Sequence, residues 1–378
     1  MKGPAMKGPA RIALAAGGTG GHMFPAEALA GELIARGHAV ALVTDRRGGG
    51  FGDRLDAVAV HRISAGGLAG SGLVRRAQGM AQLGVGFFQA RALLGRLAPA
   101  AAVGFGGYAS VPTMLAASFA GVPTVLHEQN AVLGRANRLL AKRATRIATS
   151  FASVVGIDAA DRAVLTGNPV RPNIAALADE AYLPILPDGE IRLLVVGGSQ
   201  GARVFGRLLP EAIAAIPEAL RRRLRLVQQV RAEDLDAVRA TYARQGTSAE
   251  LAPFFSDIPQ RLRAAHLVVA RAGASTVAEL TAAGRPAILV PFPFATDDHQ
   301  TANAKAIEAA GGAWLMPETS TPPAALAERL ASLLARPDVL ARAAEAARQQ
   351  GRRDAAARLA DLVTSLIRSN GSSQREAA

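Results

Sequence analysis

The segment IRLLVVGGSQGA, residues 191–202, runs from a short apolar stretch directly into a glycine-rich turn. Residues 12–22, IALAAGGTGGH, show the same arrangement near the start of the chain. Each apolar stretch has the length of a buried strand, and a helical pattern follows each turn. Short strands that alternate with helices favour a parallel sheet covered on both faces. The two segments therefore predict two doubly wound α/β domains, each with a phosphate-sized turn at the carboxyl end of its first strand.

The length of 378 residues agrees with two domains, because single cores stop growing near about 250–300 residues. Half of the residues are hydrophobic, which excludes a wholly disordered chain. We predict an N-terminal domain over 10–172, a proline-marked linker over 173–190 and a C-terminal domain over 191–350. We also predict a C-terminal helix over 351–368 that packs back on the N-terminal domain, and a disordered tail over 369–378.

The net charge of +13 is concentrated in the first half of the chain. Residues 1–172 carry 19 basic and 8 acidic side chains, whereas residues 173–378 carry 24 and 22. Such a one-sided positive field indicates an anionic membrane, nucleic acid or phosphates as the partner. Only 4% of the residues are aromatic and no basic, aromatic-interleaved motif occurs, so we do not expect nucleic acid binding. The absence of cysteine excludes disulfides and thiol chemistry, and no spacing of histidines or acids predicts a metal site.

Two regions bear on membrane contact. Residues 97–126 carry no charge, but repeated prolines and glycines interrupt them, so we expect a soluble chain without a transmembrane span. Residues 68–97 combine apolar residues with arginines and predict an interfacial helix on anionic lipid. An ordinary core helix with extended arginines is the alternative. The predicted membrane contacts are Leu73, Val74, Arg75, Arg76, Phe87, Phe88 and Arg91.

Two glycine-rich turns and one polar cluster follow predicted strands of the first domain. Residues 17–21 lead to His22 at a helix entrance, and residues 104–108 form the second turn. Backbone N–H groups in such turns can approach phosphates closely, so the two turns could hold one diphosphate. Residues 127–130, His-Glu-Gln-Asn, suit a hydroxyl-rich ligand such as a sugar. Tight packing without a ligand is the alternative. A nicotinamide enzyme is a weaker reading, because Met23 breaks the dinucleotide fingerprint.

The second domain contains two further candidate binding segments. In residues 271–279, Ser275 or Thr276 is expected to cap a helix whose N-terminus favours phosphate. Glu279, one turn further on, could accept hydrogen bonds from a ribose diol, although a capping box without a ligand explains the same residues. The apolar loop 291–296 leads into acids and amides at 297–303, which could frame a sugar.

Seven segments, taken in order, resemble the MurG-type family of peptidoglycan glycosyltransferases. These enzymes are UDP-N-acetylglucosamine: undecaprenyl-diphospho-muramoyl-pentapeptide N-acetylglucosaminyltransferases. The segments are Gly17–His22, Gly104–Tyr108, His127–Asn130, Gly167–Arg171, Gly197–Ala202, Ala274–Glu279 and Asp297–Asn303. The resemblance covers nearly all of residues 10–365. It implies a GT-B fold, in which two Rossmann-like domains face a deep cleft.

The resemblance also implies the positions of the substrate-binding residues. In the second domain, the donor UDP-N-acetylglucosamine is expected to contact Ser199, Gln200, Phe255, Ala274, Ser275, Thr276, Val277, Ala278, Glu279, Gln300 and Asn303. Of these, Ser199 would meet the diphosphate, Phe255 the uracil, Glu279 the ribose and Gln300 with Asn303 the sugar. Residues of the first domain would complete the donor site from across the cleft, namely Thr19, Gly20, Gly21, Asn130 and Arg171. The acceptor diphosphate would lie against Gly18, Gly104, Gly106, Gly107 and Tyr108.

The implied reaction transfers N-acetylglucosamine, with inversion, to the C4 hydroxyl of the muramoyl sugar of undecaprenyl-diphospho-muramoyl-pentapeptide. His22 is the first candidate for the general base, because the pKa of histidine lies near neutral pH, and Glu128 is the second. No tightly bound cofactor is expected, and a divalent cation such as Mg²⁺ would assist without a protein metal site. The expected location is peripheral, on the cytoplasmic face of the inner membrane, with other cell-wall synthesis proteins as further partners.

Two alternatives stay open at this point. One is a GT-B transferase that uses another lipid acceptor, such as diacylglycerol. The other is a catalytically inactive scaffold, which would not need an ordered set of polar residues.

Overall fold

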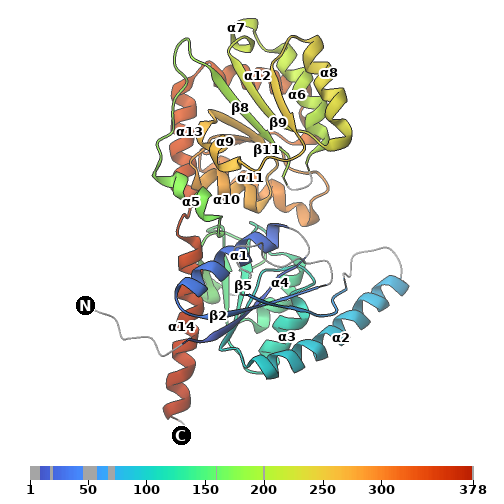
Figure 1. Cartoon of the computed structure of the whole chain (residues 1–378), viewed down its shortest axis with the longest axis vertical. Helices are drawn as coiled ribbons and strands as arrows, with labels where there is room; N and C mark the ends of the chain where they lie inside the picture. Colours follow the sequence, from blue (N-terminus) through green and yellow to red (C-terminus); the bar gives the residue numbers. More distant parts are fainter. Residues whose placement is uncertain are drawn as a thin grey trace, which may run out of the picture. The chain divides into compact units, whose positions relative to one another are not determined.

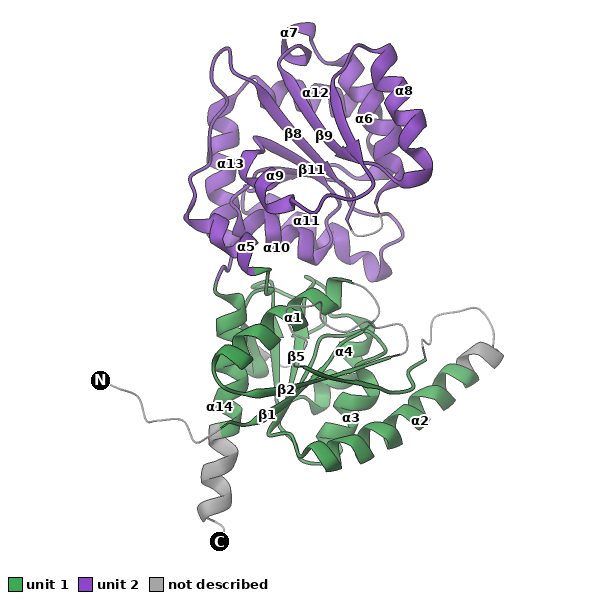
Figure 2. Ribbon diagram, in the orientation of Figure 1, with its two compact units in different colours: residues 1–171, 354–378 green, residues 172–353 purple. Residues whose placement is uncertain are grey.

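The computed structural model describes residues 9–17, 20–45, 58–66, 73–158, 160–198 and 201–376, apart from the side chains of 73–76, 160 and 368–376. The chain divides into two compact units (Figure 2). Unit 1 consists of Met1–Arg171 and Asp354–Ala378, and unit 2 consists of Pro172–Arg353. Each unit is built on one parallel sheet, which confirms the predicted pair of doubly wound α/β domains.

The sheet of unit 1 has seven strands among the described residues, in the order β3-β2-β1-β4-β5-β6-β7. They are β1 (Arg11–Ala15), β2 (Ala39–Thr44), β3 (Ala59–Arg62), β4 (Ala101–Gly104), β5 (Thr124–Glu128), β6 (Arg146–Thr149) and β7 (Ala163–Leu165). All neighbouring pairs are parallel, and Ile12 of β1 lies opposite both Val40 of β2 and Ala101 of β4. The chain therefore builds the sheet outward from β1 in both directions.

Helices cover both faces of this sheet (Figure 1). They are α1 (Gly20–Ala35), α2 (Leu73–Leu97), α3 (Val111–Phe119), α4 (Arg135–Leu140) and α14 (Ala355–Glu376), with short 3₁₀ turns at Ala141–Arg143 and Ala160–Arg162. Side chains alternate along β1, so Ile12 and Leu14 pack with α1 and α14, while Ala13 and Ala15 pack with α2 and α3. An ion pair of 2.6 Å between Arg36 and Asp361 further ties α1 to α14.

The sheet of unit 2 has, in the described part of the chain, six parallel strands in the order β10-β9-β8-β11-β12-β13. They are β8 (Ile191–Val196), β9 (Leu224–Gln229), β10 (Ala249–Ala252), β11 (Leu267–Ala270), β12 (Ala287–Leu289) and β13 (Ala313–Leu315). The helices are α5 (Pro172–Ala175), α6 (Arg203–Ala215), α7 (Glu218–Arg221), α8 (Leu235–Arg244), α9 (Ile258–Ala264), α10 (Ala274–Ala282), α11 (His299–Ala309), α12 (Pro323–Leu334) and α13 (Pro337–Gln350). Short 3₁₀ turns are η4 (Ala176–Asp179), η5 (Ala232–Asp234), η6 (Thr296–Asp298) and η7 (Glu318–Ser320). The side chains of Val195, Leu209 and Leu330 place α6 and α12 against one face of the sheet.

The strand order reverses once in each sheet, between β1 and β4 in unit 1 and between β8 and β11 in unit 2. In open parallel sheets, ligands bind outside the carboxyl ends of the strands at such a reversal. The glycine turns at 17–21 and 104–107 follow β1 and β4, and the segments 197–202 and 271–276 follow β8 and β11. All four predicted phosphate-binding segments therefore lie where this topology favours a ligand.

Two local features differ from the sequence-based expectations. Proline is typical of the first turn of a helix, so Pro25 predicts a helix that starts beside it; α1 instead begins at Gly20, and Pro25 lies inside the helix. Proline lacks an N–H, which leaves the carbonyl of Gly21 without its helical donor, a loss that the exposed start of a helix tolerates. At the other end of the chain, α14 continues to Glu376 and overlaps the segment 369–378 that we expected to be disordered.

No helix in the described ranges is both long and apolar enough to cross a membrane. The uncharged stretch 97–126 forms β4, α3 and β5, as its prolines and glycines predicted.

Buried polar side chains hold the carboxyl edge of unit 1 together. The ring of His127, at the end of β5, is fully buried, and its Nε2 lies 3.0 Å from the carbonyl oxygen of Gly167. The amide Nε2 of Gln129 lies 3.0 Å from Nδ1 of His127 and 2.9 Å from the carbonyl oxygen of Phe105. The amide therefore donates to Nδ1, and the neutral ring donates from Nε2 to Gly167. Burial, reinforced by the nearby His22, lowers the pKa of His127 to about 4.

This environment makes the stability of unit 1 depend on pH. Between pH 6.5 and pH 4 the unfolded chain binds a proton at His127 that the folded chain does not, so stability is complete above pH 6.5 and falls as the pH drops toward 4. The loss over this window is about 3 kcal/mol.

We expect His127→Asn to be less stable than the wild type at pH 7 but to lose about 3 kcal/mol less on acidification. Urea denaturation at pH 7 and pH 4, with half-exposed His299→Asn as the control, measures the difference. Equal acid dependence in the wild type and His127→Asn would contradict the neutral buried ring.

Candidate active site

The second glycine turn of unit 1 lies against the side chain of His22. Gly106 and Gly107 adopt left-handed φ angles of 82° and 71°. A Cβ atom at Gly106 would lie 3.4 Å from Cε1 of His22, and one at Gly107 would lie 3.3 Å from its Cδ2. The imidazole therefore lies directly against the second turn, at the start of α1. This places a titratable group beside backbone that only glycine adopts without strain.

The other residues predicted for the acceptor diphosphate lie in different surroundings. Gly104 is the last residue of β4, and a Cβ there would lie 2.6 Å from Cγ of Met114, so glycine is needed for α3 to pack on the strand. Tyr108 is half-buried and packs against the core between α2 and α3. Gly18 and Thr19 lie outside the described residues. Gly20 and Gly21 form the first turn of α1, whose N–H groups suit an anion.

The Glu128 carboxylate is buried and fully engaged. It accepts hydrogen bonds from the backbone N–H groups of Asn130 at 3.0 Å and Gly134 at 2.9 Å. The side-chain amide of Asn130 donates to it at 3.3 Å and that of Asn137 at 2.8 Å. Only 1% of Glu128 is exposed. This carboxylate therefore organises the loop that carries Asn130.

Asn137 is a site residue that the sequence analysis missed. Its amide also donates to the carbonyl oxygen of His127 at 3.2 Å, and a Cβ atom at Gly106 would lie 3.6 Å from its Nδ2. Only its position on a helix that follows a polar loop could have indicated this role. Elsewhere in unit 1, the guanidinium of Arg171 lies 5.7 Å from the ring centroid of half-exposed Phe24.

In unit 2, the N-terminus of α10 follows β11 and therefore lies at the reversal in strand order between β8 and β11. The helix begins at Ala274 with Gly273 as its N-cap, so Ser275 and Thr276 lie in the first turn and do not cap it. The Ser275 hydroxyl has no hydrogen-bond partner among the described residues, whereas the N–H of Val277 is bonded to Gly273 at 2.9 Å. Backbone groups of residues 274–276 are thus the ones available to a phosphate. Val277 itself is 3% exposed and packs inward, while Ala278 and Glu279 are half-buried.

Arg271 is a second residue whose role the sequence did not reveal. Its guanidinium, 8% exposed, donates to the carbonyls of Val290 at 3.1 Å and Pro291 at 3.0 Å and pairs with Glu318 at 2.6 Å. It also lies 5.4 Å from the ring centroid of Phe292. Arg271 therefore joins the segments that follow β11, β12 and β13.

The predicted sugar-binding residues of unit 2 are partly used to hold their own loop. Gln300 accepts a hydrogen bond from the backbone N–H of Phe292 at 2.9 Å, and buried Asn303 donates to the carbonyl of Ala272 at 3.0 Å. Asp297 and Asp298 adopt left-handed φ angles of 53° and 51° just before α11, a conformation that costs non-glycine residues energy. The strained turn and these bonds fix the loop 291–300 beside the start of α10.

Phe255 is 6% exposed, and the guanidinium of Arg261 lies 4.1 Å from its ring centroid. Its side chain is thus occupied by packing, which leaves the backbone for the predicted contact with a base. Ser199 and Gln200 lie outside the described residues.

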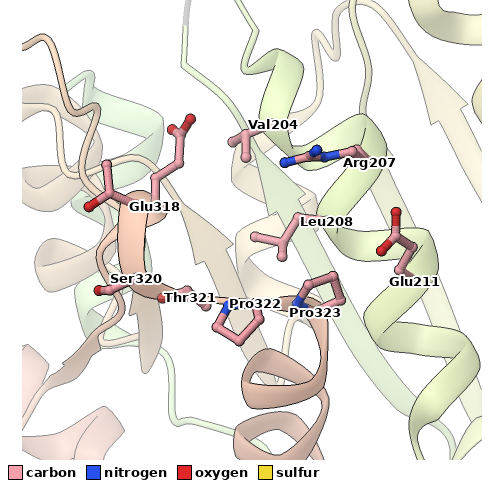
Figure 3. A pocket seen from close by; sticks show the side chains of 10 residues that line it. Val204, Arg207, Leu208, Glu211, Glu318, Ser320, Thr321, Pro322 and Pro323 are labelled. Carbon is pink, nitrogen blue, oxygen red and sulfur yellow. The ribbon is translucent and has the colours of Figure 1, made fainter.

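A cavity of about 500 Å³ opens between α6 and the segment from η7 to the start of α12 (Figure 3). Figure 3 shows Arg207 and Glu211 projecting from α6 on one side and Glu318 on the other. None of the residues predicted to bind the donor lines this cavity. Its connection to the carboxyl edge is Glu318, the partner of Arg271.

The outer face of α2 carries the described part of the predicted membrane contact. Phe88 is 71% exposed, while Phe87 turns inward and contacts both Phe88 and Phe119, with ring centroids 5.5 and 5.9 Å apart. The guanidinium of Arg143 lies 4.6 Å from the ring centroid of Phe119. Arg91 is exposed on the same helix. The aromatic contacts thus connect exposed Phe88 of α2 with Phe119 and Arg143, whereas the side chains of residues 73–76 lie outside the described residues.

Among the described residues, no group of three or more histidine or acidic side chains is close enough to hold a metal ion.

Comparison with known proteins identifies the family. The N-terminal domain model of glycosyltransferase family 28 matches residues 12–149, and the C-terminal domain model of that family matches residues 192–359. A UDP-N-acetylglucosamine--N-acetylmuramyl-(pentapeptide) pyrophosphoryl-undecaprenol N-acetylglucosamine transferase of Rhodospirillum rubrum is 60% identical over 94% of this chain and 92% of its own. The enzyme of the same name from Paramagnetospirillum magneticum is 58% identical over 94% and 96%.

The solved structures agree with this result. The crystal structure of Acinetobacter baumannii MurG has a TM-score of 0.78 and 30% identity, over 94% of this chain and all of that one. The calicheamicin glycosyltransferase CalG4, at 18% identity and a TM-score of 0.65, shares the fold. The two matched domains and the high identity to full-length relatives show that this chain belongs to glycosyltransferase family 28, with the two-domain GT-B fold.

Proposed function

We propose that this chain transfers N-acetylglucosamine from UDP-N-acetylglucosamine to the muramoyl sugar of undecaprenyl-diphospho-muramoyl-pentapeptide, forming lipid II for peptidoglycan synthesis. The observation that carries this proposal is the 60% identity, over nearly the whole chain, to a relative named for this transfer. The anion-binding edges of both sheets support it, because both substrates contain a diphosphate.

The donor diphosphate is assigned to unit 2. The first turn of α10 offers free N–H groups and the unpartnered Ser275 hydroxyl, and the glycine turn after β8 faces the same reversal in strand order. These fixed dipoles would stabilise the negative charge that develops on the leaving UDP. Ser199 and Gln200 belong to the proposed donor set of unit 2. The donor contacts predicted for unit 1, namely Thr19, Gly20, Gly21, Asn130 and Arg171, stay predictions from the family resemblance. We also propose that a divalent cation such as Mg²⁺ assists the reaction without binding to a metal site of the protein.

The acceptor diphosphate is assigned to the glycine-rich segments of unit 1, where His22 lies against Gly106 and Gly107. The C4 hydroxyl of the muramoyl sugar attacks C1 of N-acetylglucosamine, and the bond from C1 to the UDP oxygen breaks, which inverts the anomeric carbon. His22 would take the hydroxyl proton as the attack proceeds.

The transfer itself is the first test. Purified protein should move labelled N-acetylglucosamine from its UDP donor to a polyprenyl-diphospho-muramoyl-pentapeptide analogue and not to diacylglycerol. Label on diacylglycerol, or on neither acceptor while UDP still binds, would replace the proposed acceptor with another lipid.

If His22 is the base, His22→Ala should lower kcat about 10²–10⁴-fold while the affinity for UDP stays within about twofold. Glu128→Gln is the comparison, because it preserves shape while weakening the hydrogen bonds that hold the Asn130 loop. We expect its main effects on thermal stability and on KM. An unchanged kcat in His22→Ala, with a large loss in Glu128→Gln, would reverse the two assignments.

We also propose that the protein binds peripherally to the cytoplasmic face of the inner membrane. The supporting surface is formed by exposed Phe88 and Phe119 with Arg91 and Arg143. Aromatic side chains enter the lipid interface while arginines attract anionic headgroups. A lipid-linked acceptor requires such a location, and other cell-wall synthesis proteins are proposed as neighbours there.

Vesicle flotation tests this surface. Binding should increase when phosphatidylglycerol is added to phosphatidylcholine vesicles and weaken in about 1 M salt, where the Debye length is about 3 Å. Phe88→Glu should reduce binding severalfold, whereas Leu186→Glu, at a residue of unit 2 that is also exposed, should not. Binding that is indifferent to anionic lipid, salt and Phe88→Glu would contradict the proposal.

A further inference from the structure

Gln229 lies at the carboxyl end of β9, next to the central strand β8, and only 8% of it is exposed. Its Oε1 accepts a hydrogen bond from the backbone N–H of Gly197 at 3.0 Å. Its Nε2 donates to the carbonyl oxygens of Gly198 and Pro253, both at 3.1 Å. One side-chain amide therefore connects the turn after β8 with the loop after β10.

The backbone after β8 adopts a conformation that leaves no room for side chains, so main-chain hydrogen bonds must stabilise it. A Cβ at Gly197 would lie 2.3 Å from the backbone nitrogen of Ala202. Gly198 and Gly201 adopt φ angles of 83° and 67°, and the N–H of Gly201 donates to the carbonyl of Gly198 at 3.0 Å. Without Gln229, the buried N–H of Gly197 would lose its acceptor, which destabilises this conformation of the turn.

The loop after β10 leads directly to the residue predicted to meet the uracil. Pro253 precedes Phe254 and Phe255, and Arg261 packs on the ring of Phe255. Pairing of β9 with β10 ends where Val230 donates to the carbonyl of Ala252 at 3.0 Å. Beyond that point, the hydrogen bond from the Gln229 side chain to the carbonyl of Pro253 holds the two segments together in place of backbone pairing.

We propose that Gln229 is a positioning residue that sets the spacing between Gly197 and Gly198, at the start of the proposed diphosphate-binding segment, and the base-binding loop at 253–255. This inference rests on the proposed function of unit 2 as the site of a uridine diphosphate donor. The position requires one acceptor and two donors on one side chain, a set that the amide provides and that neither glutamate nor methionine can supply.

The adjacent residue in β9 provides a matched control. Gln228 is fully buried and points to the opposite face of the sheet. Its amide donates to the carbonyl of Phe205 at 3.0 Å, and it accepts a hydrogen bond from the Tyr242 hydroxyl at 2.6 Å. It therefore holds α6 and α8 rather than the loops at the strand ends.

The experiment compares Gln229→Met and Gln229→Glu with Gln228→Met in the full chain. Hydrogen–deuterium exchange without nucleotide measures the backbone protection of the two loops. Titration calorimetry measures the affinity for UDP, and transfer kinetics separate KM from kcat. We expect both Gln229 variants to exchange faster at 197–202 and 252–256. Their Kd for UDP and KM for the donor should rise about tenfold, with kcat at saturating donor and the acceptor KM within about threefold of the wild type.

Gln228→Met should lower the melting temperature while leaving the Kd for UDP unchanged. Wild-type affinity for UDP in Gln229→Met, or equal losses of affinity in the Gln229 and Gln228 variants, would overturn the positioning role. Failure of the wild type to bind UDP would overturn the proposed donor site instead. The exchange measurement would then decide separately whether Gln229 connects the two loops.

Discussion

The carboxyl edge of a parallel sheet imposes one constraint on which both units depend. Each chain segment leaves the hydrogen-bonded ladder there, and its backbone polar groups need new partners. In unit 1 the amide of Gln129 and the ring of His127 bond to the segments after β4 and β7. In unit 2 the amide of Gln229 bonds to the segments after β8 and β10. Neutral, buried side chains thus fix loops that would otherwise have many conformations.

This arrangement also suits the substrate binding proposed for the same edge. Buried side chains hold the loops in place through hydrogen bonds. The turns can therefore consist of glycine, and their backbone N–H groups stay accessible to a ligand. His22 lies against Gly106 and Gly107, and the first turn of α10 leaves its N–H groups open. A diphosphate is recognised by such preorganised N–H groups at low cost, because they need not rearrange when the charge arrives.

Some polar side chains at this edge stabilise loops and are not themselves placed to meet a ligand. Glu128 is the second candidate for the base from the sequence, yet its carboxylate accepts hydrogen bonds from four donors in the structure. Arg271 precedes the predicted phosphate-binding helix, and its guanidinium donates to two carbonyls and pairs with Glu318. Glu128 thus stabilises the loop that carries Asn130, and Arg271 stabilises the segments that follow β12 and β13.

The sequence by itself determined the two α/β units, the strands and the order of the motifs, because strand and helix periodicity and glycine turns are local properties. It also placed the candidate residues at strand ends, and the family resemblance assigned their chemistry. Only the tertiary structure decided that Gly104 makes room for Met114, that Phe87 turns inward while Phe88 is exposed, and that Asn137, Arg271 and Gln229 support the site. These roles depend on contacts between residues far apart in the chain, for which spacing along the sequence carries no information.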